Sequence, residues 1–177
     1  MAAHDLGRIK CPTIGMNRTI AGFPGYSGPQ PDYYCFVDWC WVDLPRYRRL
    51  VLQHPCIING SDQKEDIGYR VVRHPRFAPF SFDLERDGYA GPIPASTGHM
   101  ALQLAAFLGF TEIHCLGWDM GGGHFDGTRA SPHFPDAIRY HKRQAPYLKE
   151  RGINVFVCGS PASNVEGFEH SAFEAVC

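Results

Sequence analysis

The sequence lacks several features that would place the protein in a broad class. No apolar run approaches the roughly 20 residues that a membrane-spanning helix needs. The first residues, Met1–Leu6, lack the basic and then apolar pattern of a signal peptide, so we predict a cytoplasmic protein. The 17 basic and 18 acidic residues leave a net charge of −1, so no overall field attracts nucleic acid or a membrane surface.

Common ligand-binding and catalytic motifs are also missing. The chain contains neither Gly-x-Gly-x-x-Gly nor Gly-x-x-x-x-Gly-Lys-Ser/Thr, which argues against a standard dinucleotide or P-loop site, and it has no Gly-x-Ser-x-Gly elbow. Its seven cysteines form no Cys-x-x-Cys pair, and Cys35, Cys40 and Cys56 with His54 match no familiar zinc spacing. We therefore predict no metal centre, no tightly bound cofactor and no cysteine nucleophile. Four cysteines lie in apolar runs and are expected to be buried thiols: Cys35, Cys56, Cys115 and Cys158.

The length and the pattern of apolar segments favour a single α/β domain. A chain of 177 residues that is 44% hydrophobic can bury one sizeable core. Short apolar runs separated by helical stretches favour a mostly parallel sheet flanked by helices. Segments 74–94 and 120–135 lack periodicity, and we expect loops there, the first a lid or a missed element. The expected strands are Ile9–Gly15, Tyr33–Val37, Cys56–Asn59, Ile113–Leu116 and Ile153–Cys158, with a helix over Asp136–Arg151 and a short helix at the C-terminus.

The central stretch Ile93–Asp119 has the most informative pattern. Ser96 is a good N-cap, and apolar residues at helical spacing through Leu108 predict a helix packed on one face. Gly109 suits the left-handed residue that ends a helix. The strand Ile113–Leu116 then leads to polar residues, so this stretch predicts a helix, a tight turn and a buried strand.

Polar side chains follow three of the predicted strands. Asn17, Asp38 and Asp119 come after strands whose carboxyl ends meet at one sheet edge, where open parallel sheets bind ligands. A helix that starts at residues 96–98 offers the backbone N–H groups of its first turn and a positive dipole end, which suit a phosphate. We predict a nucleotide-type ligand between this helix start and Asp119. The alternative is an ordinary helix and strand with no ligand.

Several of the nine histidines are candidates for chemistry. His99 and His114 belong to the predicted central helix and strand, where a hydrogen-bonded structural role is expected. His133 follows Asp119 in the chain and could accept a proton from an attacking hydroxyl; the alternative is a surface-loop histidine. His124 with Asp126 could instead hold a divalent ion.

The central block resembles a known family. Residues Ser96–Ala101, Leu108–Ile113 and Leu116–Asp119 are similar to the central block of bacterial CMP-sialic-acid-dependent sialyltransferases of lipooligosaccharide synthesis. The same block resembles a related domain in motility-associated sugar transferases and in 6-hydroxymethylpterin diphosphokinases of the archaeal kind. The resemblance extends more loosely over most of the chain, and only the central block is specific.

This resemblance implies a Rossmann-like fold and an inverting, metal-independent glycosyltransferase. The enzyme would move a sialic-acid-type sugar from a CMP donor to a hydroxyl of a glycan or a small-molecule acceptor. The implied base is His133, with His141 in reserve, and Arg129 would supply positive charge to the leaving phosphate. To the family's nucleotide-binding positions we add Gly98, from the helix start, and His124, from the glycine-rich segment. The full set is Asn17, Asp38, Ser96, Thr97, Gly98, Gly117, Asp119 and His124.

Two departures from the family pattern leave alternatives open. The family opens with a strand and a Gly-x-Gly-Pro-Ser turn, whereas this sequence starts near the end of that turn, at Asp5-Leu6. The N-terminal residues or a partner chain, such as a second copy, would then cover the open sheet edge. The family's tyrosines after the Asp119 position are also missing. The alternatives are a pterin diphosphokinase-like phosphotransferase, with Mg²⁺ on Asp119 and Asp126, or a non-catalytic nucleotide-binding accessory module.

Overall fold

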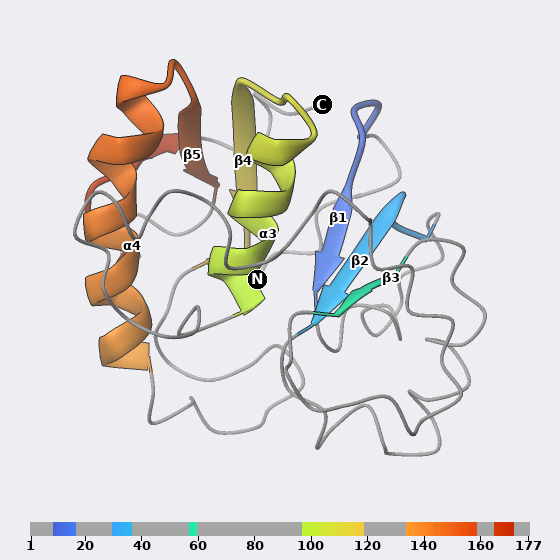
Figure 1. Ribbon diagram of the computed structural model, residues 1–177, viewed down its shortest axis with the longest axis horizontal. Coiled ribbons are helices and arrows are strands. Elements are labelled where there is room, and N and C mark those ends of the chain that lie inside the picture. Colours follow the sequence, from blue (N-terminus) through green and yellow to red (C-terminus); the bar gives the residue numbers. More distant parts are fainter. Residues whose placement is uncertain are drawn as a thin grey trace. The chain divides into compact units, whose positions relative to one another are not determined.

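The computed structural model divides the chain into two compact units (Figure 1). The N-terminal unit spans Cys11–Phe107, and the C-terminal unit comprises Leu108–Cys177 with Met1–Lys10. Within these units the structure describes residues 9–16, 30–36, 57–59, 97–118, 134–158 and 165–171. The predicted loop 74–94 lies outside these ranges, as does segment 120–133.

The N-terminal unit contains a parallel three-stranded sheet. Its strands are β1 (Ile14–Met16), β2 (Tyr33–Phe36) and β3 (Ile57–Asn59), in the order β1-β2-β3. The middle strand is an uninterrupted apolar run, and its residues after Tyr33 are completely buried. The predicted strand Ile9–Gly15 was wrong over residues 9–13, because β1 begins only at Ile14, after Pro12, which lacks the N–H group that a ladder needs. As expected for a strand next to proline, β1 lies at the edge of this sheet.

Hydrogen bonds between Thr13 and Asp32 fix the start of the first strand pair. The Asp32 Oδ2 atom accepts from the Thr13 backbone N–H (2.8 Å) and from the Thr13 hydroxyl (3.0 Å). In return, the Asp32 N–H donates to Thr13 Oγ1 (3.1 Å), and the Tyr33 N–H donates to the Thr13 carbonyl (3.0 Å). These bonds set the register in which Ile14 pairs with Tyr33.

The central helix of the sequence is α3 (Thr97–Phe107), which contacts β1 and β2. Its bounds confirm the prediction of a helix after Ser96, and Gly109 ends it with φ 87°, as expected for a left-handed residue. The burial differs from the predicted single stripe, because buried side chains occur on every face of α3. A helix that is apolar all round is typically buried all round. The buried residues include Ala101, Leu102, Gln103, Leu104 and Ala105.

The C-terminal unit contains a second parallel sheet with a long helix beside it (Figure 1). Its strands are β4 (Glu112–Leu116), β5 (Asn154–Cys158) and β6 (Glu169–Ser171), in the order β4-β5-β6. Strands β4 and β5 confirm the predicted apolar runs. No apolar pattern indicated β6, because its residues Glu-His-Ser are polar and mostly exposed. Our prediction of a helix for the last residues was therefore wrong over Glu169–Ser171.

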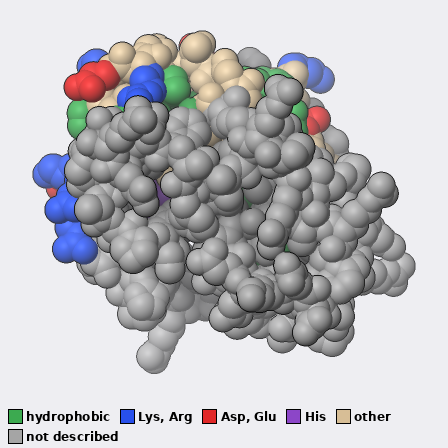
Figure 2. All heavy atoms as spheres, in the orientation of Figure 1, with side chains coloured by type: hydrophobic (Ala, Val, Ile, Leu, Met, Phe, Trp, Pro, Cys, Tyr) green, Lys and Arg blue, Asp and Glu red, His purple; other side chains and the backbone are tan. Residues whose placement is uncertain are grey.

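The helix α4 (Phe134–Glu150) packs against β5. It confirms the helix predicted from residue 136, begins two residues inside the predicted loop 120–135, and continues through the exposed Pro146. Figure 2 shows Lys and Arg side chains along the flank where α4 lies. The exposed basic side chains of this helix are Arg139, Lys142, Arg143 and Lys149. Of these, Lys142 forms an ion pair with Glu166, which lowers the pKa of that carboxyl through the hydrogen bond and the charge.

The end of α4 forms a complete Schellman motif. The Gly152 N–H donates to the carbonyl of Lys149 (2.9 Å), and the Ile153 N–H donates to the carbonyl of Leu148 (3.0 Å). Gly152 has φ 71°, a conformation that glycine adopts without steric cost. Ile153 and Leu148 are both buried, as the apolar contact of this motif requires. Gly152 therefore ends α4 next to Arg151, the residue at which the helix was predicted to end.

Together the two units show a mixed α/β fold in which the strand pairs of both sheets are parallel. Among the residues that the structure describes, no helix combines the length and the apolar character needed to cross a membrane.

Two glycines of the C-terminal unit give a matched pair for a stability measurement. Gly152 and Gly167 both have positive φ (71° and 94°), so alanine is strained at either position. A Cβ atom at position 152 meets nothing within 4 Å, whereas one at position 167 lies 3.0 Å from the Ala145 Cβ atom on α4. We expect Gly152→Ala to lower the free energy of unfolding by about 1 kcal/mol. Gly167→Ala should lower it by roughly a further 1–3 kcal/mol, because α4 must also shift.

Urea unfolding of both variants and the parent, followed by circular dichroism, measures this difference. Equal losses of stability in the two variants would contradict the close packing of Gly167 against α4.

Candidate functional site

The structure describes four of the predicted site residues. Thr97 and Gly98 lie at the start of α3, Gly117 follows β4, and His141 lies in α4. The other predicted site residues lie outside the described ranges: Asn17, Asp38, Ser96, Asp119, His124, Arg129 and His133.

The first turn of α3 has the features expected of an anion-binding helix start. The first backbone N–H groups of a helix have no acceptor within the helix, and they carry the positive end of its dipole. No acidic side chain occupies this turn. Thr97, Gly98 and His99 are all buried, so an anion held here would be shielded from water. Burial lowers the pKa of His99 from its ordinary value of 6.5 to about 3, so its ring is neutral at physiological pH.

Gly117 lies at the carboxyl end of β4, at the edge of the sheet where ligands bind in parallel α/β proteins. It is exposed and has φ 73°, a left-handed conformation that redirects the chain just before Asp119. In the N-terminal unit, β1 and β2 likewise end at a common edge, one residue before Asn17 and two before Asp38.

His141 lies in a different environment from that of an active-site base. Its side chain is completely buried. The ring centroid is 4.5 Å from that of Trp118 and 6.1 Å from that of Phe168, all within the C-terminal unit. An aromatic cage of this kind is typical of a core side chain, which favours His133 over His141 as the residue for acid–base chemistry.

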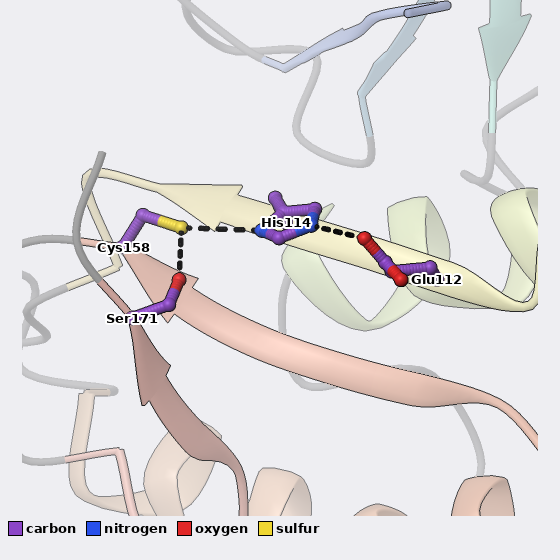
Figure 3. A network of polar contacts seen from close by, with 4 residues as sticks. All are labelled: Glu112, His114, Cys158 and Ser171. Carbon is purple, nitrogen blue, oxygen red and sulfur yellow. Dashed lines mark hydrogen bonds and ion pairs between the residues drawn. The ribbon is translucent and has the colours of Figure 1, made fainter. Parts of the chain in front are cut away.

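A polar network that the sequence did not indicate lies on one face of the C-terminal sheet (Figure 3). His114 on β4 lies between Glu112 of the same strand and Cys158, the last residue of β5. Its Nε2 atom is 2.8 Å from Glu112 Oε1, and its Nδ1 atom is 3.6 Å from Cys158 Sγ. The sulfur is also 3.0 Å from the hydroxyl oxygen of Ser171, the last residue of β6. The four side chains therefore form a continuous chain from carboxylate to hydroxyl.

The chemistry of the partners determines the protonation of this network. A carboxylate can only accept hydrogen bonds, so Nε2 of His114 carries a proton that it donates to Glu112. In the neutral imidazole, Nδ1 then has a lone pair directed at the Cys158 thiol. Burial raises the pKa of Cys158, and the hydrogen bond with Ser171 lowers it by a smaller amount. The resting state is a protonated thiol beside a base.

The ring of His114 is held in place by stacking as well as by hydrogen bonds. The ring of Phe156, which pairs with His114 across the sheet, lies 5.0 Å away and within 18° of parallel. The side chain of His114 is 15% exposed and that of Glu112 is 66% exposed. The expected hydrogen-bonded role of His114 is confirmed, while Cys158 is buried as predicted but in polar surroundings.

Only part of this network could be predicted from the sequence. Glu112 and His114 are two residues apart in a strand, so they share a face. Their proximity to Cys158 and Ser171 depends on how three strands pair, and β6 itself had no apolar pattern.

Neither a search for metal ligands among the described residues nor a comparison with known proteins assigns a function to the site. Within the described ranges, no group of three or more His, Cys, Asp and Glu side chains could hold a metal ion. The described cysteines, Cys11, Cys35, Cys115 and Cys158, are free thiols. Comparison of the chain with family models, curated proteins and solved structures finds no match.

Proposed function

We propose that the protein is a glycosyltransferase that moves a sialic-acid-type sugar from a CMP donor to an acceptor hydroxyl. The observation that carries this proposal is the block Ser96–Asp119, whose residues resemble those of the CMP-dependent sialyltransferases. Two local features of the fold support it: the helix starts at Thr97, and the strand β4 ends in the left-handed Gly117.

The donor phosphate is proposed to bind at the first turn of α3. Its oxygens would accept hydrogen bonds from the backbone N–H groups at Thr97 and Gly98 and from the Ser96 hydroxyl. In a buried turn these interactions are stronger than in water, because the local dielectric constant is lower. The resemblance to the sialyltransferases assigns the cytidine moiety to the remaining family positions of the set, Asn17, Asp38, Gly117 and Asp119, to which we add His124.

The proposed reaction is a single displacement at the anomeric carbon. His133 takes the proton from the acceptor hydroxyl, whose oxygen forms a bond to the anomeric carbon as the bond to the phosphate oxygen breaks. The departing CMP takes the bonding electron pair. The N–H groups of α3 and the guanidinium of Arg129 stabilise the negative charge that develops on the phosphate.

Nucleotide-dependent thermal stabilisation tests this proposal. We expect CMP to raise the unfolding temperature of the intact protein equally with Mg²⁺ and with EDTA, because the proposed site uses N–H groups and no metal. At a ligand concentration about 100 times the Kd, binding adds about 2.7 kcal/mol to the stability, which is readily measured. CDP, UDP and ATP are the comparison nucleotides.

The other outcomes contradict the proposal in distinguishable ways. Stabilisation by ATP only when Mg²⁺ is present would instead indicate a phosphotransferase of the pterin diphosphokinase kind. The absence of a shift with every nucleotide would indicate an accessory module without nucleotide chemistry.

A further inference from the structure

We propose that Cys158 is a peroxide-reactive cysteine, with His114 as its general base and Glu112 as the residue that positions that base. This inference is independent of the proposed glycosyltransferase activity, because it rests only on side chains of the C-terminal sheet (Figure 3).

The geometry is that of a nucleophile with an oriented base. The lone pair of His114 Nδ1 is directed at Cys158 Sγ across 3.6 Å, within reach for a sulfur donor. Glu112 selects the tautomer that leaves this lone pair available, since its Oε1 atom accepts from Nε2 at 2.8 Å. Stacking on Phe156 prevents the ring from turning away. Three independent contacts therefore hold the imidazole against the thiol.

The burial of the thiol indicates the size of its reaction partner. Cys158 is only 3% exposed, so a bulky disulfide or an activated acyl group would reach the sulfur poorly. Hydrogen peroxide is scarcely larger than water and can enter such a site. Cys158 also lies at the carboxyl end of β5, where side chains project from a parallel sheet toward ligands.

The reaction balances with hydrogen peroxide as the only co-reactant. The thiol proton of Cys158 passes to His114 Nδ1, and the sulfur attacks one peroxide oxygen. The O–O bond breaks, and the leaving hydroxide takes the proton back from His114 and departs as water. The sulfur is oxidised to a sulfenic acid, one peroxide molecule is reduced, and the imidazole returns to its starting state. The Ser171 hydroxyl, 3.0 Å from the sulfur, is placed to hydrogen-bond to the thiolate as it forms.

Cys115 provides an internal control in the same sheet. It lies on β4 with its side chain on the opposite face from His114, and burial raises its pKa as it does that of Cys158. Among the described residues no side chain forms a hydrogen bond with its sulfur. Cys115 is 6% exposed, twice as much as Cys158. If exposure alone set the rate, Cys115 would react with hydrogen peroxide at least as fast as Cys158. If His114 acts as a base, Cys158 reacts faster.

The experiment treats the folded, full-length protein with hydrogen peroxide for a series of times and removes the excess with catalase. The protein is then unfolded in urea that contains dimedone, so that the trap reaches sulfenic acids at buried cysteines. Peptide mass spectrometry then gives the labelling rate of each cysteine. We expect Cys158 to be labelled at least about tenfold faster than Cys115, and His114→Gln to remove this advantage. Glu112→Ala should lower the Cys158 rate by a smaller factor, because the imidazole keeps its place but not its tautomer. Glu169→Ala, which removes an exposed carboxylate from the same sheet, should leave the rate unchanged.

The two cysteines also distinguish loss of the base from loss of the fold. Partial unfolding of a variant raises the labelling of both cysteines together, whereas loss of the base lowers that of Cys158 alone. If His114→Gln unfolds, the exposed position of Glu112 makes Glu112→Ala the variant that decides. Equal labelling of Cys158 and Cys115 in the parent protein would overturn the proposal, as would an unchanged Cys158 rate in a folded His114→Gln or Glu112→Ala variant.

Discussion

We expect the replacement of His133 by alanine to lower the rate of the proposed sugar transfer by about 10²–10⁴-fold and to leave the proposed CMP binding nearly unchanged. The imidazole is proposed to take the acceptor proton in the transition state and to make no contact with the nucleotide. Loss of the imidazole therefore raises the activation barrier of the transfer without weakening the binding of the donor in the ground state. The measurement combines the initial transfer rate at saturating donor with a titration of CMP.

A matched variant and an alternative base complete this test. His170→Ala removes an exposed imidazole from β6 and should retain the parent rate. Full activity of His133→Ala would eliminate His133 as the base. A His141→Gln variant that remains folded but inactive would transfer that role to His141, in spite of its position between Trp118 and Phe168.

We expect the free energy of unfolding to fall in acid because of His99. Burial in α3 lowers the pKa of this ring to about 3, whereas in the unfolded chain the ring takes up a proton near pH 6.5. Between these two values the unfolded state binds one proton more than the native state, so stability decreases as the pH falls. The contribution of His99 is about 1.4 kcal/mol for each pH unit over this window, and none is lost above pH 6.5.

Urea unfolding at a series of pH values between 7 and 4 measures this contribution. His99→Gln keeps a polar side chain of similar length but cannot take up the proton, so its stability should fall less steeply with acid than that of the parent. His170→Gln is again the control, because this ring is exposed. Parallel curves for the parent and His99→Gln would show that His99 is not held neutral in the core.

Apolar pattern and turn chemistry were sufficient to predict most of the described elements. The run that became β2 is apolar over its whole length, and those that became β4 and β5 are mostly apolar. The helix of Thr97–Phe107 follows a serine, a residue type that favours the N-cap, and precedes a left-handed glycine. The strand β6 could not be predicted because a three-residue edge strand of polar side chains is held by its pairing with β5. The burial of α3 on all sides also depends on tertiary packing. The apolar pattern of the helix predicted only one buried face.

The candidate site shows the same division between local and long-range information. The start of α3 and the position of Gly117 follow from nearby residues, and both were predicted. The thiol–imidazole network joins residues 112, 114, 158 and 171, and its members meet only because β5 and β6 pair in one particular register. From its neighbours in the sequence, Cys158 was predicted only to be a buried thiol in an apolar run. The side chains that contact its sulfur lie on other strands, so the local sequence does not reveal them.

Hydrogen–deuterium exchange of the first turn of α3 is the most direct test of a nucleotide phosphate bound there. The proposed phosphate accepts hydrogen bonds from backbone N–H groups in the first turn of α3, Thr97–His99, and a bound acceptor slows the exchange of such groups. We predict that CMP, in the presence of EDTA, slows exchange in a peptide that starts at or before residue 94 and includes Thr97–His99, since the first two amides of a peptide do not retain deuterium. Unchanged exchange in this peptide, with CMP protecting a different part of the chain, would contradict a nucleotide phosphate at α3.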